Sequence, residues 1–323
     1  MLVETYPPVG PGPSEQPAPI TAPTGIHTAI AVANGKGGTG KTSVTVNVAG
    51  IAAVSGYRVL VIDLDPQGDA SKEFGRDGTG GVDLCLAVQA PHRSPLRPLR
   101  DVKPGIDLVE GGGGLVDLND LARNWADTTE PAGLRFVQAL GPLLGDYDLI
   151  LLDCPPGESR LQEMALVAAR FVVVPTRTDN YSLDGLTKVA QRFLTVRTLN
   201  PHLELLGVAI FASDTRANRW RTNAATKLAA GLGELAPVFE SFIRYSEAAA
   251  DDMRERGLLA IEYERAAARA PRWWEQLATG GRPAGFASSA DGVAGDYQRL
   301  TAEIFTARNA RLAALGLVDE ASQ

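Results

Sequence analysis

Between residues 35 and 42 the chain reads Gly-Lys-Gly-Gly-Thr-Gly-Lys-Thr, which satisfies the pattern G-x-x-x-x-G-K-[ST] at every position. The apolar run 29–33 before it is typical of a buried strand, and residues 42–54 after it have the composition of a helix. A glycine-rich turn from a strand into a helix directs backbone N–H groups at an anion, and the helix dipole adds to the attraction. This segment predicts a phosphate-binding loop.

Each residue type in the loop has a predicted task. Lys41 is expected to reach the β- and γ-phosphates of a nucleoside triphosphate, and the hydroxyl of Thr42 is expected to bind Mg²⁺. The remaining residues of the predicted nucleotide site surround the phosphates and comprise Gly35, Lys36, Gly37, Gly38, Thr39, Gly40 and Ser43.

Further apolar runs alternate with helical stretches along the chain. The predicted strands cover residues 58–63, 106–110, 147–153, 170–175, 205–211 and 238–243. The predicted helices cover residues 161–169, 182–199, 218–232, 247–269 and 297–315. This alternation predicts an α/β fold: a single P-loop NTPase domain with a mostly parallel, twisted sheet and helices on both faces.

The two ends of the chain differ from this pattern. Residues 1–25 contain seven prolines, so we expect a disordered N-terminal tail without a secretory signal. The domain is expected to span residues 26–315, with a Gly/Ser/Ala-rich loop over 280–295 and a C-terminal tail at 316–323.

Acidic residues end two of the predicted strands. Asp63 and Asp65 lie in the stretch DLDPQG, and Asp153 lies in LLDCPPG. Parallel strands deliver their carboxyl ends to one rim of the sheet, where ligands bind. Carboxylates at that rim are suited to holding Mg²⁺ or to orienting an attacking water.

The loop contains a second lysine, Lys36, in a chain where only six of the 31 basic residues are lysines. Two lysines in one small loop repel each other unless an anion lies between them or Lys36 points elsewhere. An ordinary solvated side chain is the alternative interpretation.

Taken together, GKGGTGKTS, RVLVIDLDPQGDAS and YDLILLDCPPG resemble the ParA/MinD family of P-loop ATPases, which carry the deviant phosphate loop KGGxGK[ST]. The resemblance covers roughly residues 27 to 310 and is stronger to the ParA partition branch than to the MinD branch.

The resemblance implies roles for individual residues of the loop. Lys36 matches the signature lysine that reaches across a dimer interface to the phosphates of the partner's nucleotide, so it would be catalytic together with Lys41. Gly37 matches a glycine that must stay small for two subunits to close on ATP.

The resemblance also implies roles outside the loop. Asp63 and Asp153 match the acids around Mg²⁺, and Asp65 matches the catalytic acid that positions the hydrolytic water. The stretch 173–186 is similar to the family's switch-like segment. Residues 205–216 resemble the segment near the adenine, with Asp214 as a nucleotide contact.

The resemblance implies an ATPase cycle. Two subunits form a homodimer on binding ATP and Mg²⁺, the dimer binds double-stranded DNA without sequence preference, and a ParB-type centromere-binding partner stimulates hydrolysis. The expected result is segregation or positioning of plasmid or chromosome DNA by a cytoplasmic, nucleoid-associated protein. A positioning protein for a non-DNA cargo, a MinD-like membrane-associated regulator and a non-hydrolysing nucleotide-switch scaffold remain alternatives.

The net charge of −7 argues against DNA binding through overall basicity, but a local patch is sufficient. Residues 211–230 carry four basic residues and one acid, Asp214, beside Trp220. The residues predicted to contact DNA are Arg216, Arg219, Arg221, Lys227 and, further along, Arg244.

Two other classes fit less well. No window approaches twenty apolar residues, and the final helix leads into Asp319 and Glu320, so no stable membrane association is expected. Iron-sulfur relatives need paired cysteines in two loops, which Cys85 and Cys154 cannot supply.

Overall fold

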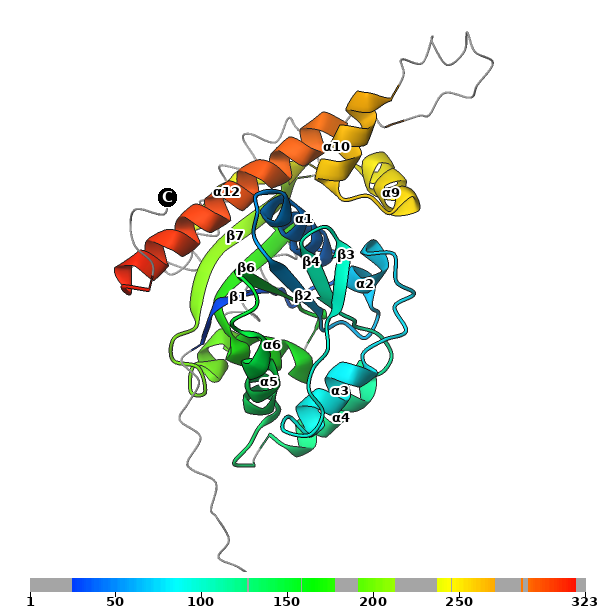
Figure 1. Ribbon diagram of the computed structural model, residues 1–323. Coiled ribbons are helices and arrows are strands. Elements are labelled where there is room, and N and C mark those ends of the chain that lie inside the picture. Colours follow the sequence, from blue (N-terminus) through cyan, green and yellow to red (C-terminus); the bar gives the residue numbers. More distant parts are fainter. Residues whose placement is uncertain are drawn as a thin grey trace, which may run out of the picture.

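The computed structural model describes residues 25–126, 128–157, 159–177, 191–212, 237–244, 246–270, 286 and 290–317. These residues form an α/β domain around one eight-stranded sheet (Figure 1). Residues 1–24 of the predicted N-terminal tail, residues 182–190 of the predicted helix 182–199 and the whole of the predicted helix 218–232 lie outside the described residues.

The sheet has the spatial order β3-β4-β2-β5-β1-β6-β7-β8. Every described neighbouring pair is parallel except β3 and β4, which run antiparallel. The mostly parallel sheet is therefore confirmed. The strands are β1 (Ile26–Val32), β2 (Val59–Asp63), β3 (Leu99–Lys103), β4 (Ile106–Val109), β5 (Leu149–Asp153), β6 (Ala169–Arg177), β7 (Glu204–Ala212) and β8 (Val238–Arg244).

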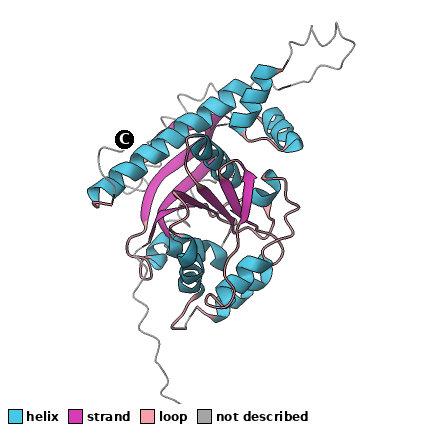
Figure 2. Cartoon of the chain, viewed as in Figure 1, coloured by secondary structure: helices cyan, strands magenta, loops and turns pink. Residues whose placement is uncertain are grey.

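Helices cover both faces of the sheet (Figures 1 and 2). One face carries α1 (Lys41–Val54), α10 (Ala260–Arg269) and α12 (Ala290–Ala314), with α9 (Glu247–Arg256) beside them. The other carries α3 (Val82–Gln89), α4 (Leu115–Asn124), α5 (Ala132–Leu140) and α6 (Arg160–Ala168). The short helix α2 (Asp69–Glu73) follows β2, and a 3₁₀ turn (Gly141–Leu143) follows α5.

The core is divided by the sheet into two layers. In β1, Ala29 and Ala31 belong to the cluster under α3 to α6, whereas Ile30 and Val32 belong to the cluster under α1 and α12. Successive side chains of a strand point to opposite faces, so apolar residues at both parities bury both faces. This is why the predicted strands read as continuous apolar runs.

The helix predicted over 247–269 is wrong in one respect, because the structure divides it into α9 and α10. Gly257 has φ +61°. Its N–H donates to the Arg254 carbonyl, and the N–H of Leu258 donates to the Met253 carbonyl. This left-handed glycine cap ends α9, since the chain leaves the helical direction there.

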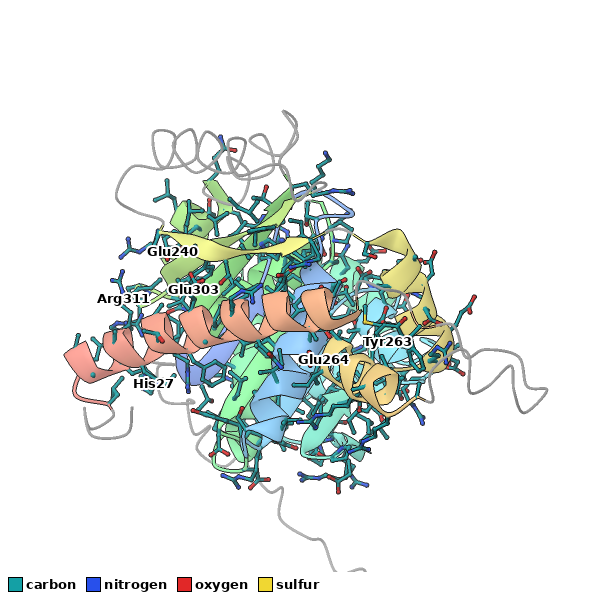
Figure 3. All side chains as sticks on the ribbon, turned by 90° about the horizontal axis from the view of Figure 1, so that it is seen from above. His27, Glu240, Tyr263, Glu264, Glu303 and Arg311 are labelled. Atoms are coloured by element: carbon teal, nitrogen blue, oxygen red, sulfur yellow. The ribbon has the colours of Figure 1, made fainter. Side chains whose placement is uncertain are left out.

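The last helix begins earlier than predicted, inside the expected loop 280–295. Val293 and Ala294 are buried in the core, and this packing outweighs the low helix propensity of Gly292 and Gly295. Further along α12, Glu303 accepts the N–H groups of Glu240 at 2.6 Å and Ser241 at 2.7 Å (Figure 3). The predicted final helix is therefore fixed to β8.

The same helix buries its apolar side chains against the protein. Ile304 is 1% exposed and Leu312 is 2% exposed. Within the parts of the chain that the structure describes, no helix combines the length and apolar composition needed to cross a membrane.

Candidate functional site: a phosphate loop beneath an acidic rim

The phosphate loop leaves the carboxyl end of β1 and is fixed by its neighbours. Asn34 Nδ2 donates to the Pro175 carbonyl at 2.6 Å, and Asn34 Oδ1 accepts the N–H of Lys36 at 2.9 Å. Gly40 has φ +89°, and a Cβ placed there would lie 2.6 Å from Cε2 of Phe211. Glycine is therefore required at this position by both backbone and packing.

Lys41, the first residue of α1, is only 7% exposed. Its Nζ donates to the carbonyl of Lys36 at 3.1 Å, so the ammonium is held across the loop. Burial lowers the pKa of Lys41, while Asp153 and other nearby acids oppose that shift. An ammonium group held in this position is suited to binding phosphate oxygens.

Asp63 and Asp153 stand side by side at the ends of β2 and β5, where they are paired in register. Both are fully buried. Asp153 accepts hydrogen bonds from Thr42 Oγ1 at 2.8 Å and Thr45 Oγ1 at 2.9 Å. Burial raises the pKa of Asp153, and the neighbouring Asp63 carboxylate adds to the effect.

These oxygen donors fit Mg²⁺, which prefers carboxylate and hydroxyl oxygens and commonly takes its other ligands from phosphates and water. Among the described residues, no group of three or more His, Cys, Asp or Glu side chains is placed to hold a metal by itself. The hydroxyl of Thr42 and the acid pair would hold a metal that a nucleotide brings with it.

Asp65 lies two residues beyond Asp63 and is 6% exposed. Its N–H donates to Asp63 Oδ1 at 3.0 Å, and its own Oδ1 accepts the N–H of Gln67 at 2.9 Å. Burial raises the pKa of Asp65. The structure therefore brings the three predicted acids to one rim, next to Lys41.

Two contacts of this rim were not predicted from the sequence. Ser71 donates its hydroxyl to Asp63 Oδ2 at 2.7 Å and its N–H to the same oxygen at 2.8 Å. Gly111 donates its N–H to Ser71 Oγ at 3.0 Å, and a Cβ at Gly111 would lie 2.6 Å from Asp63 Oδ1. The four glycines 111–114 after β4 were a signal of close backbone approach.

Replacing Ser71 by alanine is expected to raise the Mg²⁺ concentration needed for half-maximal ATP hydrolysis by about 10-fold, because residues that orient a metal ligand commonly contribute 10–100-fold. Asp63 would lose one of the two donors that fix its Oδ2. S55A is the matched control, since Ser55 Oγ donates to the Ile51 carbonyl at the far end of α1. Equal Mg²⁺ requirements in S71A and S55A would contradict the positioning role.

At the crest of the loop, Lys36 is half-buried and Gly37 is exposed. The nearest atom to a Cβ placed at Gly37 would be Pro156 Cβ, at 3.9 Å. Among the described residues there is therefore room for a Cβ at position 37.

The residues predicted to contact DNA are placed less completely. Arg216, Arg219, Arg221 and Lys227 lie outside the described residues, and so does Asp214, which was predicted to contact the nucleotide. Arg244 is described, and its Nε and Nη2 donate to the two oxygens of Asp296 at 2.7 and 3.1 Å. Its side chain is 32% exposed, so a DNA phosphate would have to compete with this buried carboxylate.

A cavity of about 350 Å³ opens beside the loop. The loop residues Gly38, Gly40 and Ser43 line it together with Phe211 and Tyr297. The volume lies within the range of small-molecule sites, so there is room for a nucleotide to extend away from the phosphate loop.

Sequence comparisons with known proteins find relatives of this chain. The family model described as "AAA domain" matches residues 27–205. The chain is 35% identical over 198 residues to the chromosome partitioning protein ParA of Myxococcus xanthus. This match covers 58% of this chain and 66% of that protein. It is 40% identical over 190 residues to the chromosome-partitioning ATPase Soj of Thermus thermophilus, a match that covers 58% of this chain and 70% of that protein. It is 33% identical over 229 residues to the chromosome partitioning protein ParA of Caulobacter vibrioides, a match that covers 68% of this chain and 82% of that protein.

Solved structures share the fold. Cobyrinic acid a,c-diamide synthase of Mycobacterium smegmatis with bound ADP and magnesium has a TM-score of 0.60 at 25% identity, covering 80% of this chain and 98% of that chain. The septum site-determining protein MinD of Pyrococcus horikoshii has a TM-score of 0.58 at 18% identity, covering 85% and 95%. Because of these relatives, its phosphate loop and its acidic rim, the chain belongs to the ParA branch of the ParA/MinD family of P-loop ATPases.

Proposed function

We propose that this protein is a partition ATPase that dimerises on ATP, binds DNA without sequence preference and hydrolyses ATP when a ParB-type partner stimulates it. The observation that carries the proposal is the placement of Lys41, Thr42 and the acids Asp63, Asp65 and Asp153 at one rim of the sheet. The curated relatives named above are described as chromosome partitioning proteins, which points to DNA as the cargo.

The chemistry is hydrolysis of ATP to ADP and phosphate with Mg²⁺. Lys41 and the loop N–H groups bind the phosphates, and Thr42 with the buried acid pair would hold Mg²⁺, which would supply charge neutralisation for the phosphates. Asp65, whose carboxylate is fixed by the N–H of Gln67, orients the attacking water.

Dimerisation on ATP would complete the site. The space around Gly37 within one subunit supports the view that a second subunit requires glycine there. Lys36, at the same crest, would then reach the partner's nucleotide and stabilise charge in the transition state.

DNA binding would follow from the dimer. Arg216, Arg219, Arg221 and Lys227 give one stretch of the chain a positive charge, and a two-fold dimer presents that stretch twice. Contacts to phosphates alone carry no base preference. A protein that binds DNA in this way would be found at the nucleoid.

The test is sedimentation and DNA binding with ADP and with a slowly hydrolysed ATP analogue. The wild-type protein is expected to form dimers and bind a random-sequence duplex only with the analogue. G37V is expected to remain monomeric while binding ADP normally, because a Cβ at position 37 would lie 3.9 Å from the nearest atom among the described residues.

A second variant separates DNA binding from dimerisation. The R219E/R221E protein is expected to dimerise with the analogue but to lose DNA affinity by at least about 10-fold, because it reverses two phosphate contacts per subunit. Nucleotide-dependent dimers of the wild-type protein that do not bind DNA would contradict the proposal and favour a different cargo.

A further inference from the structure

Arg192 connects a helical stretch of the chain to the neighbours of the phosphate loop, and no motif assigns it a task. It lies in the helical residues 191–196, and its side chain is 13% exposed. Its Nη1 donates to the carbonyl of Gly157 at 3.0 Å and to Gln162 Oε1. An Nη1 atom carries two hydrogens, so this one nitrogen can serve both acceptors.

The first route from Arg192 to the loop passes through Gly157. Gly157 lies in the turn that follows β5 and Asp153, and its φ of +78° favours glycine there. The N–H of Gly157 donates to the carbonyl of Gly35 at 3.1 Å. Arg192 therefore holds the carbonyl of a residue whose own N–H holds the first residue of the phosphate loop.

The second route passes through Gln162 of α6, which is 1% exposed. Its Nε2 donates to the carbonyl of Asn34 at 3.5 Å, while its Oε1 accepts from Arg192. A carbonyl only accepts and a guanidinium only donates, so Arg192 fixes which way the Gln162 amide faces. Asn34 Oδ1 in turn accepts the N–H of Lys36 at 2.9 Å. Both routes therefore end at residues 34–36, the first turn of the loop.

The charge of Arg192 also has a partner, but at a longer distance. Its Nε lies 3.8 Å from Glu163 Oε1, and Glu163 is already paired with Arg160 at 2.6 Å. A partly exposed ion pair at such a distance contributes little to stability. The link from Arg192 to the loop therefore depends on the two hydrogen bonds of Nη1.

We propose that Arg192 is a positioning residue that holds the first turn of the phosphate loop in place for the nucleotide. It acts through Gly157 and Gln162 rather than by contact with the nucleotide. The carbonyl of Lys36 accepts Lys41 Nζ at 3.1 Å, so the placement of this turn also affects where the Lys41 ammonium lies. The inference rests on the proposed function only in taking the loop as the nucleotide site.

The experiment measures hydrogen exchange at single amides of the nucleotide-free full chain. Lys36 and Gly157 are the reporters, because their N–H groups donate within this network. In R192M, which lacks the donors, exchange at both amides is expected to accelerate by about 10-fold while the amides of β2 keep their wild-type rates. The Kd for ADP is expected to rise by about 10-fold, because the loop would hold its binding arrangement for a smaller share of the time.

Two variants serve as controls. R197Q is the matched one, because Arg197 lies five residues further along and donates to the Pro201 carbonyl at 3.4 Å, away from the loop. E163Q removes the ion pair of Arg192 but neither of the Nη1 hydrogen bonds. Both variants are expected to keep the wild-type exchange rates at the two reporters and the wild-type Kd for ADP.

A double variant tests whether Arg192 and Gln162 share a route. Residues of one hydrogen-bond network are not additive. Exchange at Lys36 in R192M/Q162M is therefore expected to be less than about 2-fold faster than in R192M alone. Independent contributions would instead multiply the effects of the two single variants.

Wild-type exchange at the reporters, or an unchanged Kd for ADP, in folded R192M would overturn the proposal. An equal acceleration in β2 would also overturn it, because it would show a general loss of stability. So would multiplied effects in R192M/Q162M, or an acceleration in E163Q as large as in R192M. The exchange is measured without nucleotide, DNA or partner, so failure of this assignment and failure of the proposed function are distinguishable.

Discussion

Replacing Lys36 by glutamine is expected to lower the maximal rate of ATP turnover by about 10³-fold, the lower end of what a cation supplied in trans contributes to phosphoryl transfer. Lys36 stands at the half-buried crest of the loop, whereas Lys41 already crosses the loop to the carbonyl of Lys36. The resemblance to the ParA/MinD family assigns Lys36 to the second nucleotide of a dimer, and that assignment is what this variant tests.

The measurement is steady-state phosphate release with saturating ATP, Mg²⁺ and DNA. ADP affinity is the internal control, because Lys41 and the loop backbone remain in K36Q. An ADP affinity that falls as much as the turnover would contradict a role in trans, since it would show that Lys36 binds its own subunit's nucleotide. K72Q is the matched control: Lys72 pairs with Asp69 on the exposed side of α2.

Much of this site could be predicted from the sequence because its motifs are local. The loop is one continuous segment, and each strand-end acid directly follows its own apolar run, so the rule that parallel strands end at one rim brings the acids together. The structure confirms that rim, with Asp63 and Asp153 in register on adjacent strands.

The site residues that could not be predicted from the sequence reach the site from other elements of the fold. Ser71 and Gly111 reach Asp63 only because α2 and the end of β4 fold over β2. The break at Gly257 was visible as a glycine but was outweighed by the alanine-rich helical composition around it.

The strand β3 was missed for a different reason. It reads Leu-Arg-Asp-Val-Lys, and its side chains are mostly exposed or half-buried, as befits the edge of the sheet. Such a strand lacks the apolar run that marks the central ones. Its pairing with β4 depends on a tight turn at Gly105, which has φ +76°.

Replacing Asp65 by asparagine is expected to lower ATP turnover by about 10² to 10⁴-fold, which is the usual contribution of a positioned acid or base. Asparagine keeps an oxygen for the N–H of Gln67 and keeps the backbone N–H that donates to Asp63, so the loop and the metal acids should hold their positions. ATP binding and dimerisation are therefore expected to persist, and the dimer should remain on DNA. Wild-type turnover in D65N would contradict the water-positioning role.

Mixing the D65N and K36Q proteins tests whether Asp65 and Lys36 of one subunit act on the same nucleotide or on different nucleotides of a dimer. If Lys36 acts on the partner's nucleotide and Asp65 on its own, a mixed dimer contains one complete site, formed by the K36Q subunit's Asp65 and the D65N subunit's Lys36. Equal mixing should then restore about a quarter of wild-type turnover, because about half of the dimers are mixed and each has one of two sites intact. If both residues act within one subunit, no mixed dimer has a complete site. Absence of recovery, with mixed dimers detected by co-purification of a tagged subunit, would therefore contradict action in trans.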